Sequence, residues 1–165
     1  MNIKLKNIKY FAAGSEETSC FTASVYIDGM KAGDVKNDGH GGCNYYYPHE
    51  LETKLSAYAD TLPPVTSSLE VDGKPFVYEP NADNVIDELL DEYLAAKELR
   101  RLLHSGKAIY TVTDRPGIFA SSRLTSAQLA TLLKVGIAGL PSKWNAKELL
   151  NTMRFEEALE IYRTA

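Results

Sequence analysis

"CFTASVYIDGMKAGDVKN", residues 20–37, decides how the first third of the chain folds. The first half of this stretch alternates apolar and polar residues, which is the pattern of a strand with one buried face. The apolar positions are Phe21, Ala23, Val25 and Ile27. Asp28-Gly29 is a strong signal for a two-residue hairpin turn, after which the chain returns as the partner strand. The stretch therefore predicts an antiparallel β-hairpin.

The hairpin is flanked by a further strand and by a helix. Residues 3–10 alternate lysine with apolar residues, which predicts a strand, and the alternation slips near Asn7, which indicates a β-bulge or a bend. On the other side, apolar residues recur at helical spacing between Pro48 and the Pro63-Pro64 pair. We expect a three-stranded antiparallel sheet that is followed by this helix.

The middle of the chain carries a second turn signal and the longest predicted helix. Asp72-Gly73 lies between β-branched and aromatic residues and predicts a second β-hairpin. Residues 81–105 predict a helix whose acidic start and basic end both complement the helix dipole. Its apolar residues point in one direction up to Tyr93 and in another from Ala96 onward, so we expect each half to pack against a different layer.

The last third predicts shorter elements. Residues 107–122 indicate a strand, a turn and a strand. Thr125 and Gln128 form a capping-box pattern that opens a helix, residues 135–146 are expected to form a loop, and residues 155–163 predict a closing helix. The whole pattern is that of an α+β protein, with an N-terminal antiparallel sheet and helix, a long central helix, a second β-hairpin and C-terminal helices.

We treat residues 1–165 as a single α+β domain. A candidate subdivision separates residues 1–65, with the sheet and one helix, from residues 66–165, with the hairpin and the other helices. Its basis is the Pro63-Pro64 pair followed by the Thr66-Ser67-Ser68 run, since prolines and small polar residues mark turns and loops.

Composition and charge bound the class of protein. With 44% hydrophobic and 24% charged residues in a length of 165, the chain has the make-up of a globular protein. A net charge of −4 argues against a general nucleic-acid binder. No apolar run approaches the ~20 residues that span a bilayer, and the first residues lack the apolar core of a signal peptide. We therefore expect a cytoplasmic protein with no membrane partner, in which Cys20 and Cys43 are free thiols.

The segment "NDGHGGCNYYYPHELE", residues 37–52, is the main candidate for chemistry. One interpretation is a zinc site, because thiols and imidazoles are ligands that zinc prefers. The ligands of such a site would be Cys20, His40, Cys43 and His49. Their spacing lacks the paired C-x-x-C of known zinc motifs. We therefore predict no metal and no cofactor, and keep the zinc site as an alternative.

Other interpretations of this segment involve catalysis, phosphate or geometry. Cys43 would act as a nucleophile with His40 or His49 as base and Asp38 or Glu50 to orient that base. A phosphate cradle would need backbone N–H groups from the glycines, although the Lys-Ser or Lys-Thr of a P-loop is missing. We favour an interpretation in which the glycines and their polar neighbours serve turn geometry, and we predict no catalytic residue.

The same segment is a candidate contact surface. Three consecutive tyrosines cannot all face one core, so at least one of Tyr45, Tyr46 and Tyr47 should be exposed. Exposed tyrosine is a favoured contact residue for proteins and for bases. Asp38 and His40, which precede the tyrosines, belong to the same candidate surface.

Two charged clusters lie on the long predicted helix. The acidic cluster is a candidate surface for a basic partner and consists of Asp83, Asp87, Glu88 and Asp91. The basic cluster, which would contact phosphate in a nucleic-acid-binding protein, consists of Lys97, Arg100, Arg101, His104 and Lys107. A solvated helix face and complementation of the helix dipole explain both clusters without a partner. Trp144, in the expected loop, is a further candidate contact residue.

Three segments resemble a family of small uncharacterised proteins of bacteriophages and plasmids. They are "LKNIKYFAAGSEETSCFTASVYIDGMKAGDVKNDGHGGCN", "LRRLL" and "RFEEALEIYR". The resemblance covers about half of the chain and supplies no catalytic residues. It implies an accessory protein of a mobile element, a group in which small cytoplasmic inhibitors of host defence, CRISPR inhibitors among them, are common.

We therefore expect a non-enzymatic phage or plasmid accessory protein that binds and masks a host protein, such as a component of a CRISPR-Cas defence system. One alternative is a metal- or thiol-dependent enzyme that uses Asp38, His40, Cys43 and His49. The other is a nucleic-acid-binding protein, which the net charge disfavours.

Overall fold

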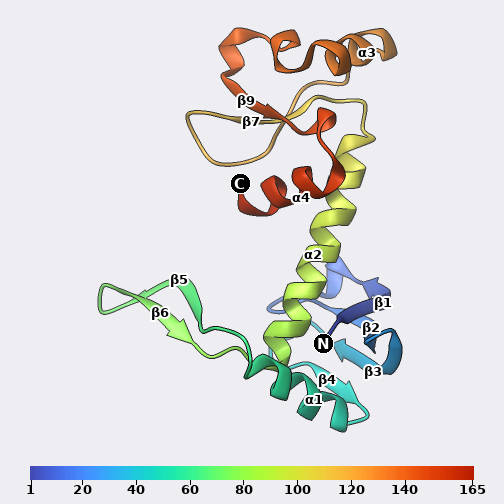
Figure 1. Cartoon of the computed structure of the whole chain (residues 1–165), viewed down its shortest axis with the longest axis vertical. Coiled ribbons are helices and arrows are strands. Elements are labelled where there is room, and N and C mark those ends of the chain that lie inside the picture. The colour runs from blue at the N-terminus through green and yellow to red at the C-terminus, as the bar shows by residue number, and fades with distance from the viewer. The chain divides into compact units, whose positions relative to one another are not determined.

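An antiparallel sheet forms the start of the chain, as Figure 1 shows. The computed structural model describes residues 1–165 except for the side chain of Ser68. Within these residues it holds four α-helices and three antiparallel sheets, which confirms the predicted α+β class. The chain divides into two compact units, Met1–Leu90 and Asp91–Ala165, and the division falls inside the longest helix. The candidate division from the sequence lay at residues 65 and 66.

The first sheet has four strands in sequence order. They are β1 (Ile3–Tyr10), β2 (Phe21–Ile27), β3 (Met30–Asn37) and β4 (Tyr45–Tyr47). The prediction of three strands is therefore corrected, because the tyrosines that we assigned to the loop pair with β3. Tyrosine favours strands, and Gly33 gives β4 room, since a Cβ at that position would lie 2.4 Å from the carbonyl oxygen of Tyr47.

The predicted irregularity and turn of this sheet are confirmed. The register of β1 against β2 shifts between Lys6 and Lys9, and Asn7 has a φ of 54°, which is a bulge at the predicted place. Asp28 and Gly29 have φ angles of 49° and 87°. Two positive φ angles are what a tight hairpin turn of this type requires.

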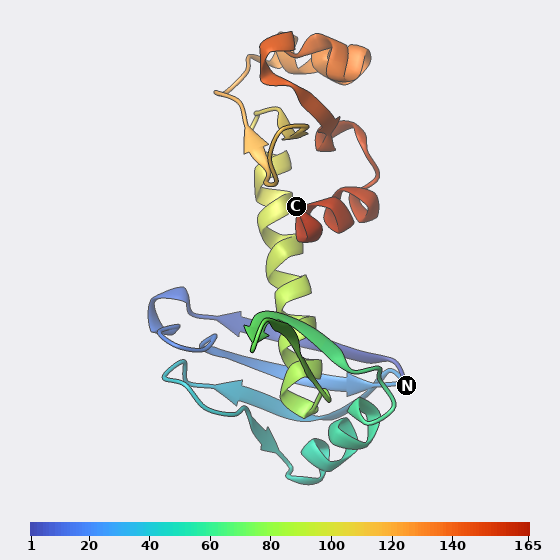
Figure 2. The ribbon, with the colours of Figure 1, turned by 90° about the vertical axis from the view of Figure 1, so that its left-hand side faces the viewer.

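One face of the sheet is buried under two helices. Helix α1 (Glu50–Ala59) buries Leu51, Leu55 and Ala59, as its predicted spacing requires. The beginning of α2 (Ala82–Leu103) also lies against the sheet in Figures 1 and 2. The strands contribute their alternate apolar residues to this core: Phe21, Ala23, Val25 and Val35.

The second predicted hairpin is also present. It consists of β5 (Val65–Val71) and β6 (Lys74–Tyr78), joined at Asp72-Gly73, whose φ angles are 53° and 72°. Leu69 and Phe76 are exposed on this hairpin.

Helix α2 takes part in both units with different faces, as predicted. Ile86 and Leu90 are buried in the first unit. Leu99 is buried in the second unit in a cluster with Ile109 and Leu150.

The second unit surrounds a three-stranded sheet in the order β8–β7–β9. Its strands are β7 (Ile109–Val112), β8 (Phe119–Ala120) and β9 (Ala146–Leu149). The capping box of Thr125 and Gln128 opens α3 (Ser126–Val135), and α4 (Phe155–Thr164) closes the chain, both as predicted. The expected loop at residues 135–146 contains two short 3₁₀ helices, Gly136–Gly139 and Ser142–Trp144. Other short 3₁₀ helices are Ala12–Gly14 and Leu150–Thr152.

Among the residues that the structure describes, no helix has both the length and the apolar character needed to cross a bilayer.

The burial of Leu99 generates a test of the second unit. We expect Leu99→Ala to lower the free energy of unfolding by about 2–5 kcal/mol, because the side chain is fully buried and its removal leaves a cavity. Trp144 is the single tryptophan of the chain and lies in the second unit, so its fluorescence during urea titration measures the effect. Leu133→Ala, at a side chain that is 47% exposed, is the control and should change the free energy by about 0.5 kcal/mol or less. Equal effects would contradict this packing.

Candidate functional site

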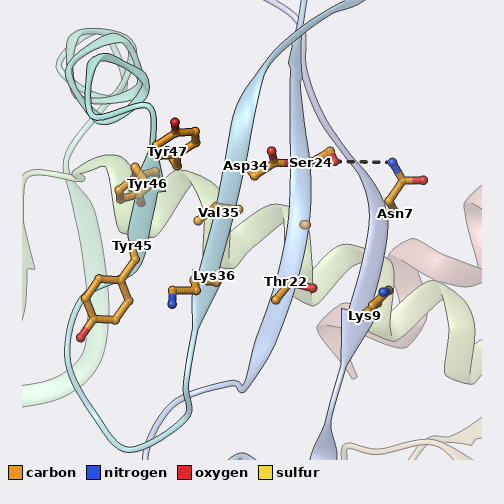
Figure 3. Close-up of a pocket in the computed structure, with 11 residues that line it drawn as sticks. Asn7, Lys9, Thr22, Ser24, Asp34, Val35, Lys36, Tyr45, Tyr46 and Tyr47 are labelled. Carbon is orange, nitrogen blue, oxygen red and sulfur yellow. Dashed lines mark hydrogen bonds between the residues drawn. The ribbon is translucent and has the colours of Figure 1, made fainter.

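The face of the first sheet that points away from α1 and α2 carries polar and aromatic side chains. Figure 3 looks onto this face, with α2 passing behind the strands. We call it the lysine–tyrosine face. It consists of Lys4, Lys6, Lys9, Thr22, Ser24, Tyr26, Lys31, Asp34, Lys36, Tyr45 and Tyr47.

The strand register places these side chains in rows across the sheet. In one row, Lys9 pairs with Thr22, Thr22 with Lys36, and Lys36 with Tyr45. Directly opposed residues of neighbouring strands have Cβ atoms about 4.5–5.5 Å apart, so the members of a row form a continuous surface. Figure 3 shows this row running across all four strands.

The next row contains the carboxylate of the face. Ser24 lies between Asn7 and Asp34, and the Ser24 hydroxyl donates to Asp34 Oδ1 at 2.8 Å. Lys31 Nζ lies 2.9 Å from the same carboxylate. Hydrogen bonds from Lys31 and then Ser24 hold the pKa of Asp34 below its ordinary value. Asp34 therefore stays ionised and neutralises part of the charge of Lys31.

The lysine–tyrosine face is strongly positive. Its described side chains include five lysines and one carboxylate, so it has a formal charge of +4 in a chain whose net charge is −4. Three of the lysines come from the edge strand β1 and two from the inner strand β3. Such a local excess attracts an anionic partner although the whole chain is acidic.

Tyrosine rings lie between these lysines. Lys6 Nζ is 4.0 Å from the centroid of the Tyr26 ring, and Lys36 Nζ is 5.5 Å from that of Tyr45. These are cation–π distances. Tyr45 is 57% exposed and Tyr47 is 78% exposed. Tyr45, Tyr47 and the four strands border an open groove of about 530 Å³, which Lys9 and Lys36 also line.

Tyr46 points to the other side of β4 and fixes the orientation of its neighbours. Its hydroxyl donates to Asp83 Oδ1 at 2.6 Å, from the first turn of α2. Burial, followed by the hydrogen bond to Asp83, raises the pKa of Tyr46. Because side chains alternate along a strand, an inward Tyr46 places Tyr45 and Tyr47 on the outer face. The expectation that at least one of the three tyrosines is exposed is confirmed.

The loop between β3 and β4 is organised around the side chain of Asn37. Thr18 Oγ1 and the backbone N–H of Gly39 both donate to Asn37 Oδ1, at 2.8 and 2.9 Å. Asn37 Nδ2 donates to Asn44 Oδ1 at 3.1 Å and to the carbonyl of Gly42 at 3.3 Å. Asn37 and Asn44 are both buried, so these bonds satisfy groups that water does not reach.

Two further contacts fasten the loop. The backbone N–H of Asn44 donates to Asp83 at 3.2 Å, and Asn44 Nδ2 donates to Asp87 at 3.1 Å. Gly39 has a φ of +88°, and a Cβ there would lie 1.9 Å from the carbonyl oxygen of Gly14. Three successive N–H groups, from residues 16 to 18, donate to the carbonyl of Gly39. In the loop itself, the N–H groups of Gly39 and Gly41 donate to Asn37 Oδ1 and Thr18 Oγ1, so these two amides are bound to the chain and not to a phosphate.

The residues of the alternative zinc site have separate partners. His40 Nδ1 lies 3.2 Å from Glu16, and His49 Nδ1 lies 3.2 Å from Glu52. Cys20 and Cys43 are free thiols, as expected. In the described part of the chain, no group of three or more His, Cys, Asp or Glu side chains could hold a metal ion.

The thiol of Cys43 lies next to a carboxylate. A hydrogen bond to Asp83, together with the negative charge of Asp83, raises the pKa of Cys43 above its ordinary value. A nucleophilic cysteine needs the opposite, a neighbouring positive charge or base that favours the thiolate.

The remaining candidate contact residues have varied positions. Asp83 and Asp87 accept hydrogen bonds from Asn44 of the chain's own loop, although Asp87 is exposed. Glu88, Asp91 and Asp38 are exposed as well. Trp144 is half-buried in the second unit and stacks on Tyr110, with ring centroids 5.3 Å apart.

The basic cluster at the end of α2 is partly used in packing and helix capping. Arg101 is bonded to Glu98, Arg100 lies over the Phe155 ring, and His104 Nδ1 contacts the carbonyl of Arg100.

Sequence reasoning missed the lysine–tyrosine face. The alternating lysines of residues 3–10 were visible, and so were Lys31 and Lys36. The register of β1, β2 and β3 brings these lysines, which are distant in the chain, onto one face, and the sequence alone did not reveal that register. A search for charges on alternate positions of each predicted strand would have found them.

Comparisons with protein-family models, with curated proteins and with solved structures find no match to this chain.

The bond between Tyr46 and Asp83 generates a stability test. We expect Tyr46→Phe to lower the free energy of unfolding by about 1–3 kcal/mol, because it removes a hydrogen bond to a charged, half-buried group. Urea titration followed by circular dichroism measures this change. Tyr47→Phe is the matched control, since its hydroxyl is on an exposed residue, and should change the free energy by about 0.5 kcal/mol or less. A neutral Tyr46→Phe would show that this bond does not hold β4.

The position of Cys43 generates a test of its reactivity. Because Asp83 raises its pKa, we expect alkylation of Cys43 by iodoacetamide to rise only at a pH above the ordinary value for a thiol. Asp83→Asn should shift that profile to lower pH. Peptide mass spectrometry across a pH series separates Cys43 from Cys20. Rapid alkylation of Cys43 at neutral pH would instead support a catalytic thiol.

Proposed function

We propose that this chain is a non-enzymatic binding protein that covers an anionic macromolecular surface with its lysine–tyrosine face. The observation that carries the proposal is the concentration of five lysines and three tyrosines on one open face of a sheet whose other face is packed. Such a local concentration of positive charge attracts an anionic partner although the chain as a whole has a net charge of −4.

Further support for binding rather than turnover comes from the glycine-rich loop. Its conformation serves the fold: Asn37 and Asn44 hold it to β3 and α2, and its one thiol contacts a carboxylate. The two histidines have different partners: His40 pairs with Glu16 and His49 pairs with Glu52. The residues therefore favour a structural role for the loop, whose function is to carry β4 to the edge of the sheet.

The resemblance to phage and plasmid proteins supplies the context of this proposal. In that context the partner belongs to the bacterial host, the location is the cytoplasm, and masking a component of a defence system such as CRISPR-Cas is the activity that we propose. The anionic surface that is masked would be that of a host protein complex, including any nucleic acid that such a complex holds.

Retention on immobilised heparin tests whether the face binds anions. We expect the native chain to be retained at low salt near pH 7 in spite of its acidic net charge, and Lys6→Glu/Lys36→Glu to abolish retention. Electrostatic binding of this kind weakens as salt rises.

The matched control is Lys97→Glu/Lys134→Glu. It has the same net charge as the test variant but changes exposed lysines of the second unit. We expect it to be retained like the native chain. Circular dichroism confirms that both variants are folded. Loss of retention in both variants, or no retention of the native chain, would overturn the proposal.

A further inference from the structure

We infer that the anionic partner of the lysine–tyrosine face is a single-stranded nucleic acid, whose phosphates contact the lysines and whose bases stack on Tyr45 and Tyr47. This inference rests on the proposed function and names the class of partner.

The first argument is that lysines and exposed rings occupy one surface. Lys36 lies beside Tyr45 in a row, and Tyr47 follows two residues along β4, opposite Asp34. Proteins that bind single strands combine positive charge along the backbone path with aromatic rings on which bases stack. Exposed aromatic residues on a four-stranded sheet are one way in which proteins form such a platform.

The second argument separates a nucleic acid from an acidic protein. Lysine is depleted in protein–protein interfaces, whereas it is a regular contact of phosphate. Here five lysines share the face with the tyrosines, two of them in contact with a tyrosine ring, and the one carboxylate among the described side chains of the face is paired with Lys31. A phosphate backbone supplies negative charges at regular intervals, which suits lysines at alternate positions of β1, such as Lys4 and Lys6, about 7 Å apart along the strand.

The third argument separates a single strand from a duplex. Neighbouring strands lie about 4.8 Å apart, so four strands span about 14 Å between the outer axes before side chains are added. The major groove of DNA is about 12 Å wide, so this face does not enter it. Stacking on Tyr45 and Tyr47 requires bases that are not already stacked in a helix. Both rings are more than half exposed, so a base can approach them.

Fluorescence anisotropy tests the inference with a labelled oligothymidylate of about 12 nucleotides, within the range that single platforms cover. Comparison probes are an abasic strand of the same length, a duplex of the same length, and poly-L-glutamate. We expect the oligothymidylate to bind more tightly than all three. Lys6→Ala should reduce the slope of log K against log salt by about 0.7, the contribution of one phosphate contact.

Substitution of Tyr45 or Tyr47 should lower the affinity for the oligothymidylate without changing the charge of the face. We expect Tyr45→Ala and Tyr47→Ala each to weaken binding of the oligothymidylate by about 5- to 150-fold, with an unchanged salt slope, because each removes one stacking ring. Tyr45→Phe keeps the ring and should bind like the native chain. Phe76→Ala removes an exposed ring of the β6 strand and is the control that should have no effect.

The outcomes distinguish this inference from the proposed function. Equal affinity for the oligothymidylate, the abasic strand and poly-L-glutamate, with retention on heparin, would overturn the inference and leave the proposed function in place. Tighter binding of the duplex, or no loss in the two tyrosine variants, would also overturn it. No binding of any probe, together with no retention on heparin, would overturn both.

Discussion

The hydrogen bond between Tyr46 and Asp83, 2.6 Å long, is the interaction on which the binding surface depends. It fixes the inner face of β4 and, because side chains alternate along a strand, sends Tyr45 and Tyr47 outward. Asp83 also accepts the backbone N–H of Asn44, so one carboxylate holds both the end of the loop and the strand that follows. Without this connection to α2, a three-residue edge strand would keep only its pairing with β3 and its contacts with α1.

The outer surface then follows from register. The bulge at Asn7 keeps Lys9 on the same face as Lys4 and Lys6, although Lys9 lies three positions after Lys6, an odd spacing. Such an extra residue restores the alternation that a regular strand would lose. The positive charge of the face therefore arises from the pairing of the strands. The net charge of the whole chain, which is negative, gives no sign of it.

Local signals predicted most elements, and distant contacts account for what was missed. The hairpin turns, the bulge, the capping box and the two faces of α2 have strong short-range patterns, and the structure confirms them. Strand β4 was missed because three tyrosines after three glycines resemble a loop. Strand β9 was not predicted, because its partner, β7, lies more than thirty residues away. The glycine-rich loop attracted chemical hypotheses through its composition, whereas a close approach to Gly14 explains why Gly39 lacks a side chain.

The most direct test of the account is a lysine footprint. Acetylation of the folded chain, with and without saturating heparin, followed by peptide mass spectrometry, measures the protection of each lysine. The account predicts that Lys6, Lys9 and Lys36 become protected, while Lys97 and Lys134, which are also exposed, react as before. Protection that is centred on residues 97–107, or that is equal at all exposed lysines, would contradict it.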